Sequence, residues 1–326
     1  MASSTTGVFC RPPCDCANPP VGRVFEHASE ALTAGFRPCR SCRPLHNREP
    51  DPDWYQPLLC EIEADPARRW HDPDLERLGL DSGTVRRWFV ENHGVTFHAY
   101  CRLWRMGELL RRIQQGAAAE PVIAELGYES ESDFREAFAL AFGHPPSAVD
   151  RESCIWLGRL RTPLGSMLAG AADAGLFLLE FADRGLTDTR LKQLRHELGR
   201  VCLPGAHPLI PRIQQEIDAY FEDGLRSFTA PVRISGTAFQ EQVWHALQTI
   251  PYGQTRSYSD IAHQVGHDDA GRAVGRATGD NRIALVLPCH RVVGSGGELV
   301  GYGGGLGRKR YLLALEQSEA FSLSRV

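Results

Sequence analysis

The spacing of apolar residues changes several times along the chain, and each change predicts a different kind of structure. Between residues 54 and 143, apolar residues recur every three or four positions between short turns, which is typical of amphipathic helices. Residues 165–182 hold two apolar runs joined by small residues, which predicts a β-hairpin. Helical spacing returns at 190–198 and 211–221, so this middle part of the chain predicts a modest α+β unit.

The first helical region contains a helix-turn-helix pattern. Residues 74–94 predict a helix, a turn at 79–81 and a second helix with Ser82 as its N-cap. Arg86 and Arg87 lie on that second helix, where they could reach DNA. An ordinary small helical bundle would show the same spacing of apolar residues, so the pattern alone leaves both interpretations open.

A second copy of this pattern follows at 118–143, with a turn at Gly127 and a helix beginning near Ser130. The segment 96–116 between the two copies predicts one long amphipathic helix. The second recognition helix is acidic where it would face DNA, which opposes contact with phosphates. The acidic residues are Glu129, Glu131, Asp133 and Glu136.

The end of the chain predicts a third helix-turn-helix. Two helices, the second beginning at Tyr258, are separated by a Pro-Tyr-Gly turn. After a further turn at Gly266, residues 270–281 predict a recognition helix. The apolar run at 283–288 then predicts an extended segment that leads to Cys289.

Length and composition limit the class of protein. With 326 residues, of which 42% are hydrophobic, the chain is too long for one ordinary core and predicts two or three domains. No run of eighteen apolar residues and no secretory signal occur, so we expect a cytoplasmic protein without a membrane partner. In a reducing compartment, the ten cysteines are expected to be metal ligands, nucleophiles or core residues rather than disulfides.

The net charge of −4 is unevenly distributed. Residues 49–150 hold nineteen acidic residues against ten basic ones, whereas residues 272–310 hold seven basic residues and only two acidic ones. The basic segment surrounds Cys289 and is a candidate nucleic-acid contact, although a solvated surface would explain the charge equally well. Of the 36 basic residues only Lys192 and Lys309 are lysines, a bias that we attribute to genome composition.

Two cysteine pairs near the N-terminus have the spacing of a metal site. Cys10 and Cys14 form a CxxxC pair, and Cys39 and Cys42 form a CxxC pair twenty-four residues further on. Two close pairs separated by a loop can supply the four thiolates of a tetrahedral zinc site. Cys16 could replace Cys14 in this set. A segment this small would depend on the metal to fold.

A different environment surrounds Cys289, within the stretch LPCHRVVG at 287–294. The nearest other cysteine is Cys202, which argues against a metal site. Neighbouring side chains on an extended chain point to opposite sides, so a protease-like pair with His290 is disfavoured. A thiol beside a DNA-reading helix suggests reaction with an alkyl carbon on DNA. A thiolate attacks such a carbon readily, and a thioether is a poor leaving group, so the transfer would be irreversible.

The glycine-rich stretch GYGGGLG at 301–307 could also be read as a loop for a dinucleotide or S-adenosylmethionine. Only nineteen residues follow it, which leaves no room for the rest of a βαβ unit. We therefore interpret it as a loop lining the alkyl pocket. The reaction is then expected to need no organic cofactor and to consume one protein molecule per lesion.

Several motifs in the chain resemble known families. PYGQTRSY, GRAVG, Asn281 eight residues before Cys289, PCHRVV and RYLLALE are similar to the O6-alkylguanine-DNA alkyltransferases. This resemblance covers residues 155–318 and is densest over 234–318. TTGVFCRPPC and AGFRPCRSC resemble the Ada zinc domain, and the double helix-turn-helix resembles the AraC family of transcription regulators. In this order, the whole chain resembles the Ada family.

The resemblance implies a multidomain α+β fold in which each part has its own architecture. A small four-cysteine zinc domain would come first, then an all-α double helix-turn-helix domain, then an α+β alkyltransferase with a ribonuclease H-like subdomain and a winged-helix-like catalytic subdomain. The implied boundaries are 1–48, 53–150, 155–230 and 234–318.

The resemblance also implies roles for the residues near Cys289. This cysteine would accept the methyl group of O6-methylguanine, or of O4-methylthymine, from a base flipped out of the duplex. His290 would take the thiol proton through a water, with Glu316 polarising the histidine and Asn281 bracing the turn. The other implied contacts are Tyr258, Arg272, Arg86 and Arg87 with DNA, and Tyr302 and the Pro288 carbonyl with the guanine.

In the zinc domain, the resemblance implies that Cys10 is both a ligand of one zinc ion and the acceptor of a methyl group from a DNA methylphosphotriester. Methylation would remove a negative charge and turn repair into a signal for transcription. The implied partners are double-stranded DNA with alkyl lesions, promoter DNA and RNA polymerase. The alternative is a transcription regulator or alkylation sensor without effective repair. The presence of Cys289, His290, Asn281 and Glu316 together favours repair.

Overall fold

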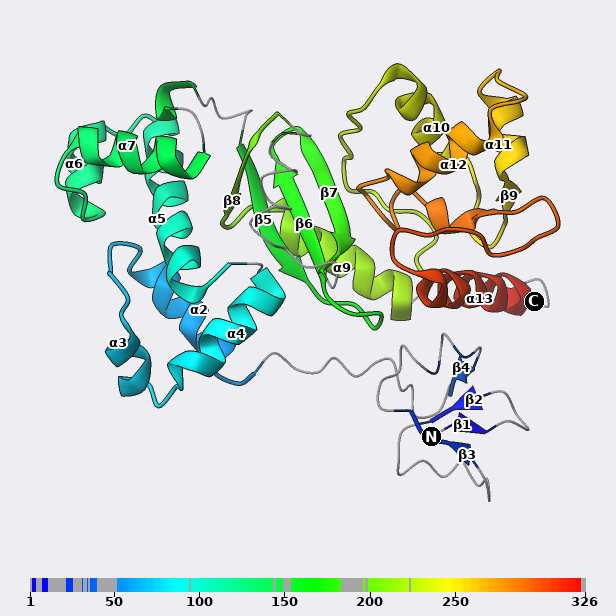
Figure 1. Ribbon diagram of the computed structural model, residues 1–326, viewed down its shortest axis with the longest axis horizontal. Helices are drawn as coiled ribbons and strands as arrows, with labels where there is room; N and C mark the ends of the chain where they lie inside the picture. Colours follow the sequence, from blue (N-terminus) through cyan, green and yellow to red (C-terminus); the bar gives the residue numbers. More distant parts are fainter. Residues whose placement is uncertain are drawn as a thin grey trace.

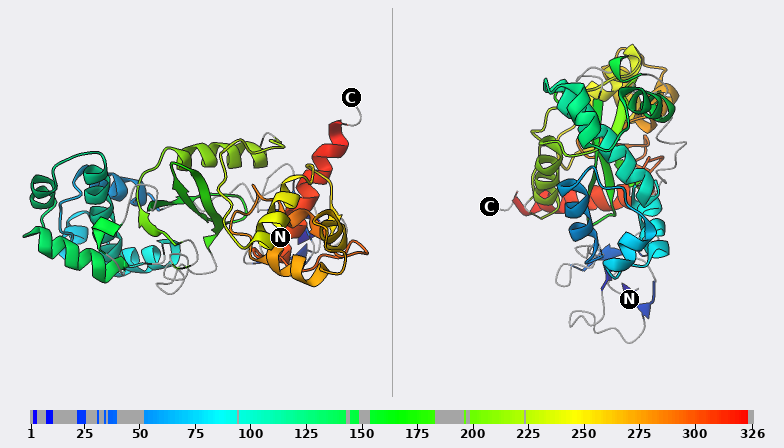
Figure 2. Two further views of the ribbon diagram at one scale, coloured as in Figure 1. Left: turned by 90° about the horizontal axis from the view of Figure 1, so that it is seen from above. Right: turned by 90° about the vertical axis from the view of Figure 1, so that its left-hand side faces the viewer.

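The computed structural model describes residues 2–3, 8–10, 22–25, 31, 34, 36–39, 52–93, 95–142, 145–148, 154–182, 196, 199–222 and 224–323. Figure 1 shows a helical unit and a second, mixed unit on opposite sides of a central sheet, with a small N-terminal sheet below the C-terminal helix. The left view in Figure 2 shows the same order of units along the long axis of the molecule.

Four short strands form the N-terminal sheet, in the order β3-β1-β2-β4. Strand β1 pairs antiparallel with both β2 and β3, whereas β2 and β4 run parallel. The strands are β1 (Ala2–Ser3), β2 (Val8–Phe9), β3 (Gly22–Arg23) and β4 (Arg37–Pro38).

The first helix-turn-helix is present, but its cap differs from the prediction. The main chain of Gly83 and the main chain and hydroxyl of Thr84 donate to the Asp81 carboxylate, so Asp81 rather than Ser82 is the N-cap. Asp81 is a strong cap because its carboxylate reaches the free N–H groups of the first turn. The helices are α2 (Tyr55–Ala64), α3 (Asp72–Arg77) and α4 (Ser82–His93).

The long helix and the second helix-turn-helix are confirmed. Thr96 caps α5 (Phe97–Gln114) through a hydrogen bond from the Ala99 main chain. The Ser130 hydroxyl accepts from Asp133 N and caps the second recognition helix, which begins near Ser130 as the sequence predicted. The remaining helices of this unit are α6 (Ala119–Glu125), α7 (Glu131–Phe142) and the single turn η1 (Pro146–Ala148).

A four-stranded sheet with the order β7-β6-β5-β8 forms the centre of the molecule. The predicted hairpin is its β6–β7 pair, and β8 is an edge strand that runs parallel to β5. Of the helix predicted at 190–198, only His196 is among the described residues, where it is helical. The elements are β5 (Cys154–Leu160), β6 (Met167–Ala172), β7 (Gly175–Phe181), β8 (Val201–Pro204) and α9 (Leu209–Glu222).

The helix-turn-helix unit packs against this sheet around Trp156. A Cβ atom on Gly107, in the middle of α5, would lie 3.1 Å from the Trp156 ring, and one on Gly205 would overlap the same ring. Glycine inside a helix costs stability unless a close approach requires it, and here it admits the indole. Leu168 and Leu178, from the neighbouring strands, are buried with the core of the first helix-turn-helix. The edge strand β8 is thereby covered.

The catalytic part predicted at the end of the chain has the expected three helices. Thr237 and Ser257 each form a capping box at the start of a helix. Trp244 of the first helix donates through Nε1 to the Ala277 carbonyl of the third. The elements are α10 (Ala238–Gln248), β9 (Arg256–Ser257), α11 (Tyr258–Gln264), α12 (Gly271–Gly279), β10 (Val292–Val293) and α13 (Leu306–Leu323).

The prediction of an extended segment before Cys289 is wrong. Val286 N donates to Ala284 O and Leu287 N to Ile283 O, both at 2.9 Å, so the apolar run folds into tight turns. Leu285 has a φ of 69°, in the left-handed region that a leucine seldom occupies. Cys289 then begins the short 3-10 helix η4 (Cys289–Arg291). The apolar side chains fill the core without forming a strand, because burial alone does not specify extended backbone.

Among the described residues, no helix combines the length and apolar character needed to cross a membrane.

Candidate active site

Cys289 lies in the core of the last domain, with 5% of its surface exposed. Asn281 Nδ2 donates to Cys289 Sγ at 3.0 Å and to Leu287 O at 2.9 Å. Asn281 Oδ1 accepts from Ile283 N at 2.9 Å, so one amide side chain spans both ends of the turn. The left-handed backbone at Leu285 is held in place by these contacts.

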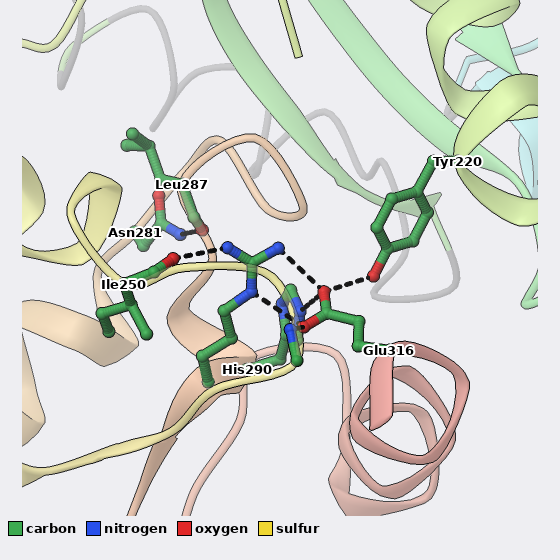
Figure 3. Close-up of polar contacts among 8 residues, drawn as sticks. Tyr220, Ile250, Asn281, Leu287, His290 and Glu316 are labelled. Carbon is green, nitrogen blue, oxygen red and sulfur yellow. Dashed lines mark hydrogen bonds and ion pairs between the residues drawn. The ribbon is translucent and has the colours of Figure 1, made fainter. Parts of the chain in front are cut away.

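Glu316, on α13, is the centre of a buried hydrogen-bond network (Figure 3). His290 Nε2 lies 2.8 Å from Glu316 Oε1. The Arg291 guanidinium donates to both carboxylate oxygens at 2.9 Å. Tyr220 Oη donates to Oε1 at 2.7 Å, and Gly253 N donates to Oε2 at 3.1 Å. The carboxylate is therefore satisfied by groups from three separate parts of the chain, and its position is fixed.

The charges in this network favour an ionised Glu316 and a neutral His290. Burial would raise the pKa of Glu316, but the hydrogen bonds from His290 and Arg291 and the charge of Arg291 lower it to about 2. Burial lowers the pKa of His290 more than the contact with Glu316 raises it. His290 Nδ1 is buried and has no hydrogen-bond partner among the described residues. With Nε2 donating to Glu316, Nδ1 is the nitrogen that can accept a proton.

The Cys289 thiol is protonated in the resting site. Burial raises its pKa, and the hydrogen bond from Asn281 and the charge of Lys309 oppose this only in part. A buried thiol of this kind needs a base before it can act as a nucleophile. The open nitrogen of His290 has the free lone pair that such a base needs.

The predicted base-binding residues border a glycine-rich loop. The Tyr302 hydroxyl is buried and has no hydrogen-bond partner among the described residues. A Cβ atom on Gly304 would lie 2.7 Å from the Tyr302 ring, so glycine is required for the loop to approach it. The Pro288 carbonyl accepts from Arg291 N at 2.9 Å. Tyr258, at the start of α11, is half-buried and donates through its hydroxyl to Val300 O at 2.9 Å.

The basic segment 272–310 is divided between surface and core. Arg272, in the first turn of α12, is exposed. Arg291 and Lys309 are only 6% and 0% exposed, so the interpretation of the whole segment as a surface patch is wrong. In the helix-turn-helix unit, Arg86 and Arg87 are exposed on α4, and Arg86 Nη2 lies 3.4 Å from Asp72 Oδ2.

The structure thus brings together four predicted residues: Cys289, His290, Asn281 and Glu316. The sequence analysis missed Arg291, Tyr220 and Lys309 as parts of the site. Arg291 had one available signal, because it directly follows His290, but its charge was assigned to the surface. Tyr220 lies 96 residues from the carboxylate that it binds, and no local pattern could have connected them.

Cys10 and Cys39 lie in a different unit, at the ends of two paired strands. The parallel register pairs Phe9 with Pro38, and Cys39 N donates to Phe9 O at 2.9 Å. Each cysteine directly follows one of these paired residues, so the two buried thiols come from adjacent strand ends. This arrangement fits half of a four-thiolate zinc site. The other predicted ligands, Cys14 and Cys42, and Cys16 lie outside the described residues.

Three family models match successive parts of the chain. Residues 1–45 match the metal binding domain of Ada, 75–152 match a helix-turn-helix domain, and 238–318 match the DNA binding domain of 6-O-methylguanine DNA methyltransferase. The first match indicates that the N-terminal domain binds a zinc ion, and the other two indicate DNA as a partner.

Two kinds of relatives match the chain: methyltransferases that match about half of it, and a protein that matches nearly all of it. The methylated-DNA--protein-cysteine methyltransferase of Mycobacterium tuberculosis H37Rv is 47% identical over 41% of this chain and 82% of its own length. The solved O6-methylguanine methyltransferase of M. tuberculosis covers 52% of this chain and 99% of its own, with 39% identity and a TM-score of 0.44. The Escherichia coli K12 bifunctional transcriptional activator/DNA repair enzyme Ada is 30% identical over 97% of this chain and 90% of its own length. The chain therefore belongs to the Ada family of bifunctional transcriptional activators and DNA repair enzymes.

Proposed function

We propose that Cys289 accepts the methyl group of O6-methylguanine, and of O4-methylthymine, in double-stranded DNA in a single irreversible turnover. The observation that carries this proposal is the contact chain from the ionised Glu316 to a neutral His290 with an open Nδ1, beside a thiol held by Asn281. This is the arrangement that general-base activation of a buried nucleophile needs.

The chemical step balances without an external reactant. His290 Nδ1 takes the proton of Cys289 through a water, and the Glu316 carboxylate stabilises the imidazolium that forms. The sulfur then attacks the methyl carbon, so the S–C bond forms as the C–O6 bond breaks, and the electron pair of that bond remains on the guanine. Guanine N1 finally takes up a proton, so that overall one proton moves from sulfur to the base. The thioether cannot be displaced, and the protein is consumed.

The proposed contacts with DNA follow from the exposed face of the last domain. Arg272 enters the base stack from the first turn of α12 and takes the place of the flipped nucleotide. Tyr258 contacts the phosphate of that nucleotide. The Pro288 carbonyl and the unpaired Tyr302 hydroxyl are proposed to bind the guanine edge, because each has hydrogen-bonding capacity left.

For the N-terminal domain, we propose that Cys10, Cys14, Cys39 and Cys42 hold the zinc ion and that Cys10 accepts a methyl group from a methylphosphotriester. Zinc would keep the Cys10 sulfur as a thiolate without a general base. Methylation of Cys10 removes one negative charge from the domain, which strengthens its attraction to promoter DNA and leads to recruitment of RNA polymerase. The proposed domain boundaries are 1–48, 53–150, 155–230 and 234–318, and the proposed location is the cytoplasm.

Peptide mapping by mass spectrometry tests both transfer reactions at once. The zinc-loaded protein is incubated with duplex DNA that carries O6-methylguanine and methylphosphotriesters. We expect one methyl group on Cys289 and one on Cys10. A methyl group on Cys289 alone would leave a guanine repair enzyme with a structural zinc domain. Methylation of neither cysteine would overturn the proposal and favour a regulator without repair.

The first helix-turn-helix is proposed to contact DNA through Arg86 and Arg87, which are exposed on its recognition helix. In duplexes selected by the wild-type protein from a random pool, Arg86→Ala and Arg87→Ala should each lower the slope of log Kd against log salt by about 1. Arg135, exposed on the acidic helix α7, provides the matched control. If Arg135→Ala alone changes the slope, the second unit makes the contact instead.

A further inference from the structure

A cleft between the helix-turn-helix unit and the central sheet takes no part in either proposed methyl transfer. It has a volume of about 620 Å³, within the range of about 300 to 1,000 Å³ that small-molecule sites occupy. Helices α2 and α5 form one wall, and β5, the loop after β8 and α9 form the other. Figure 1 shows these elements on the two sides of the boundary between the units. Such boundaries are common places for small ligands.

The wall from the helix-turn-helix unit is aromatic. Tyr55 and Tyr100 are only 4% and 6% exposed. Tyr55 Oη lies 3.0 Å from His93 Nε2, and the His93 ring centre lies 4.7 Å from that of Tyr100. Trp104 stacks on Tyr100 with 6.0 Å between the ring centres. Because each ring is fixed by its neighbours, the wall is a preorganised surface on which a planar ligand can stack.

This wall also carries polar groups that the protein leaves unused. The Tyr100 hydroxyl and the Trp104 indole N–H form no hydrogen bond within the described part of the chain. Glu63, at the exposed end of the cleft, forms no ion pair with any described residue, and partial burial raises the pKa of its carboxyl. Polar groups that are buried as deeply as Tyr100 nearly always have a hydrogen-bond partner. The Tyr100 hydroxyl is therefore available to a ligand in the cleft.

The opposite wall carries two arginines. Arg159 and Arg161 are two positions apart at the end of β5, the spacing that turns both side chains to one side of an extended chain. The Arg159 guanidinium lies 5.2 Å from the centre of the Trp88 ring, which helps to fix its position. Burial raises the pKa of Tyr55, and the charge of Arg159 opposes this shift. The positive charge therefore acts on the aromatic wall.

The sheet side of the cleft is held in shape by its own contacts. The Gln214 side chain accepts from Arg161 N at 2.8 Å and donates to Arg161 O at 3.0 Å, which ties the end of β5 to α9. A Cβ atom on Gly158 would lie 2.7 Å from Ile210 Cγ2, so glycine allows α9 to approach the strand closely. A cleft with fixed walls loses little entropy when a ligand binds.

The charges give the cleft two different ends. The arginines supply positive charge on the sheet side, whereas Glu63 supplies a hydrogen-bond acceptor on α2. Guanidinium groups bind phosphates and carboxylates through paired hydrogen bonds. A ligand that matches both ends and the aromatic wall has a planar ring, N–H donors on one edge and an anionic group on the other side.

We propose that this cleft is a binding site for a small planar heteroaromatic anion. The ring stacks on Tyr100 and Trp104, and its N–H edge donates to Glu63. The anionic group pairs with Arg159 and Arg161. Nucleoside monophosphates and heteroaromatic carboxylates share this chemistry. Binding is reversible, and because the two walls belong to different units, the ligand bridges the helix-turn-helix unit and the sheet.

Isothermal titration calorimetry on the full-length, zinc-loaded protein tests the site, with GMP as the first probe. We expect one GMP per protein molecule. Guanosine, which lacks the phosphate, should bind at least about tenfold more weakly, because hydrogen bonds between charged groups are lost. Ribose 5-phosphate, which lacks the ring, should not bind measurably. Indole-3-carboxylate distinguishes the two sources, since a preference for it over GMP supports a carboxylate ligand and the reverse supports a nucleotide.

Two conservative variants locate the ligand. Tyr100→Phe should weaken GMP binding about fivefold, since it removes one neutral hydrogen bond. Glu63→Gln should weaken it about tenfold, because an amide oxygen is a weaker acceptor than a carboxylate. The matched controls are Tyr128→Phe, whose hydroxyl also has no partner among the described residues but lies outside this cleft, and Glu91→Gln, exposed on α4. Both controls should keep the wild-type affinity.

The anionic end has its own test. In Arg159→Gln, GMP and guanosine should bind with equal affinity, because the group that favours the phosphate is lost. If Arg159→Gln does not fold, the same comparison in Arg161→Gln should show a reduced preference for GMP over guanosine.

Three results would overturn the proposal. The first is that neither GMP nor indole-3-carboxylate binds. The second is an affinity for GMP that is unchanged in both Tyr100→Phe and Glu63→Gln. The third is an affinity that falls in Tyr302→Phe but not in Tyr100→Phe, which would place the ligand in the proposed guanine pocket. The titrations use no damaged DNA, so none of these results bears on methyl transfer, and a failure of methyl transfer would not affect this site.

Discussion

The two candidate acceptor cysteines are equally buried but lie in opposite kinds of environment. Cys289 and Cys10 are 5% and 7% exposed. Around Cys289, Tyr220 and Glu316 come from α9 and α13, and Asn281 lies eight residues earlier in the chain; their hydrogen bonds surround the thiol and His290. Cys10 follows a two-residue strand, and Cys39 is the neighbour that the strand pairing brings beside it. In the proposed function, one thiol depends on tertiary packing for its activation, and the other depends on a metal.

The largest expected effect is the loss of one acceptor without the other. Cys289→Ala should abolish transfer from O6-methylguanine, because among the described residues no other thiol lies beside the residues that contact Glu316, and should leave phosphotriester transfer to Cys10 unchanged. The measurement is the loss of labelled methyl groups from defined duplexes. Guanine repair that persists in Cys289→Ala would show that another residue is the acceptor.

Removal of zinc should have the reverse effect. Chelation should stop transfer to Cys10, because thiolates that lose their metal take up protons and are then poor nucleophiles. It should also unfold the small N-terminal sheet, because the domain depends on the metal to fold. The rate at Cys289 should stay within about twofold, because its general base needs no metal. Mass spectrometry of both cysteines checks this.

The matched variants for the zinc experiment are Cys39→Ser, which removes a proposed ligand, and Cys60→Ser, which changes an exposed cysteine of α2. Only the first should reproduce the effect of chelation. Phosphotriester transfer by metal-free protein would show that the contrast between the two sites is wrong.

A smaller effect is expected when the base at Cys289 is replaced. His290→Gln should slow guanine repair by about 10² to 10⁴ while the pair between Arg291 and Glu316 remains. Single-turnover kinetics measures this rate. Tyr220→Phe removes one hydrogen bond to the same carboxylate and should lower stability by about 1 kcal/mol, with a much smaller change in rate. Equal effects of the two variants would indicate that the network serves folding rather than proton transfer.

The sequence was most informative where structure is local. The helix-turn-helix units, the hairpin and the start of a helix near Ser130 depend on residues within a few positions of one another, and all were predicted. The cap at Ser82 failed for a local reason: Asp81, one residue earlier, offers a charged acceptor to the same N–H groups and places the helix start after itself.

Burial of charge was not predictable in the same way. The positive residues near Cys289 look alike in the sequence, yet Arg272 faces solvent, whereas Arg291 is paired with Glu316 inside the core. What distinguishes them is a carboxylate 25 residues further along the chain, which only the fold brings into contact. For the same reason, the turns through Leu285 were mistaken for an extended segment. The motif pointed to the residues that we propose react, and the tertiary structure determines how their charges are balanced.

The packing of the Trp156 ring between Gly107 and Gly205 limits how the whole molecule can bind DNA. Because α5 packs against the edge of the sheet at this ring, and hydrogen bonds join Leu179 of the same sheet to Arg282 and Ala284 beyond α12, we expect α4 and α12 to keep one relative orientation. On a straight duplex, the two recognition helices can then occupy their grooves together only at certain separations, fixed by the helical repeat of the DNA. A protein bound at a promoter would accordingly reach nearby lesions at intervals set by the helical repeat, and it would favour lesions on one side of the double helix.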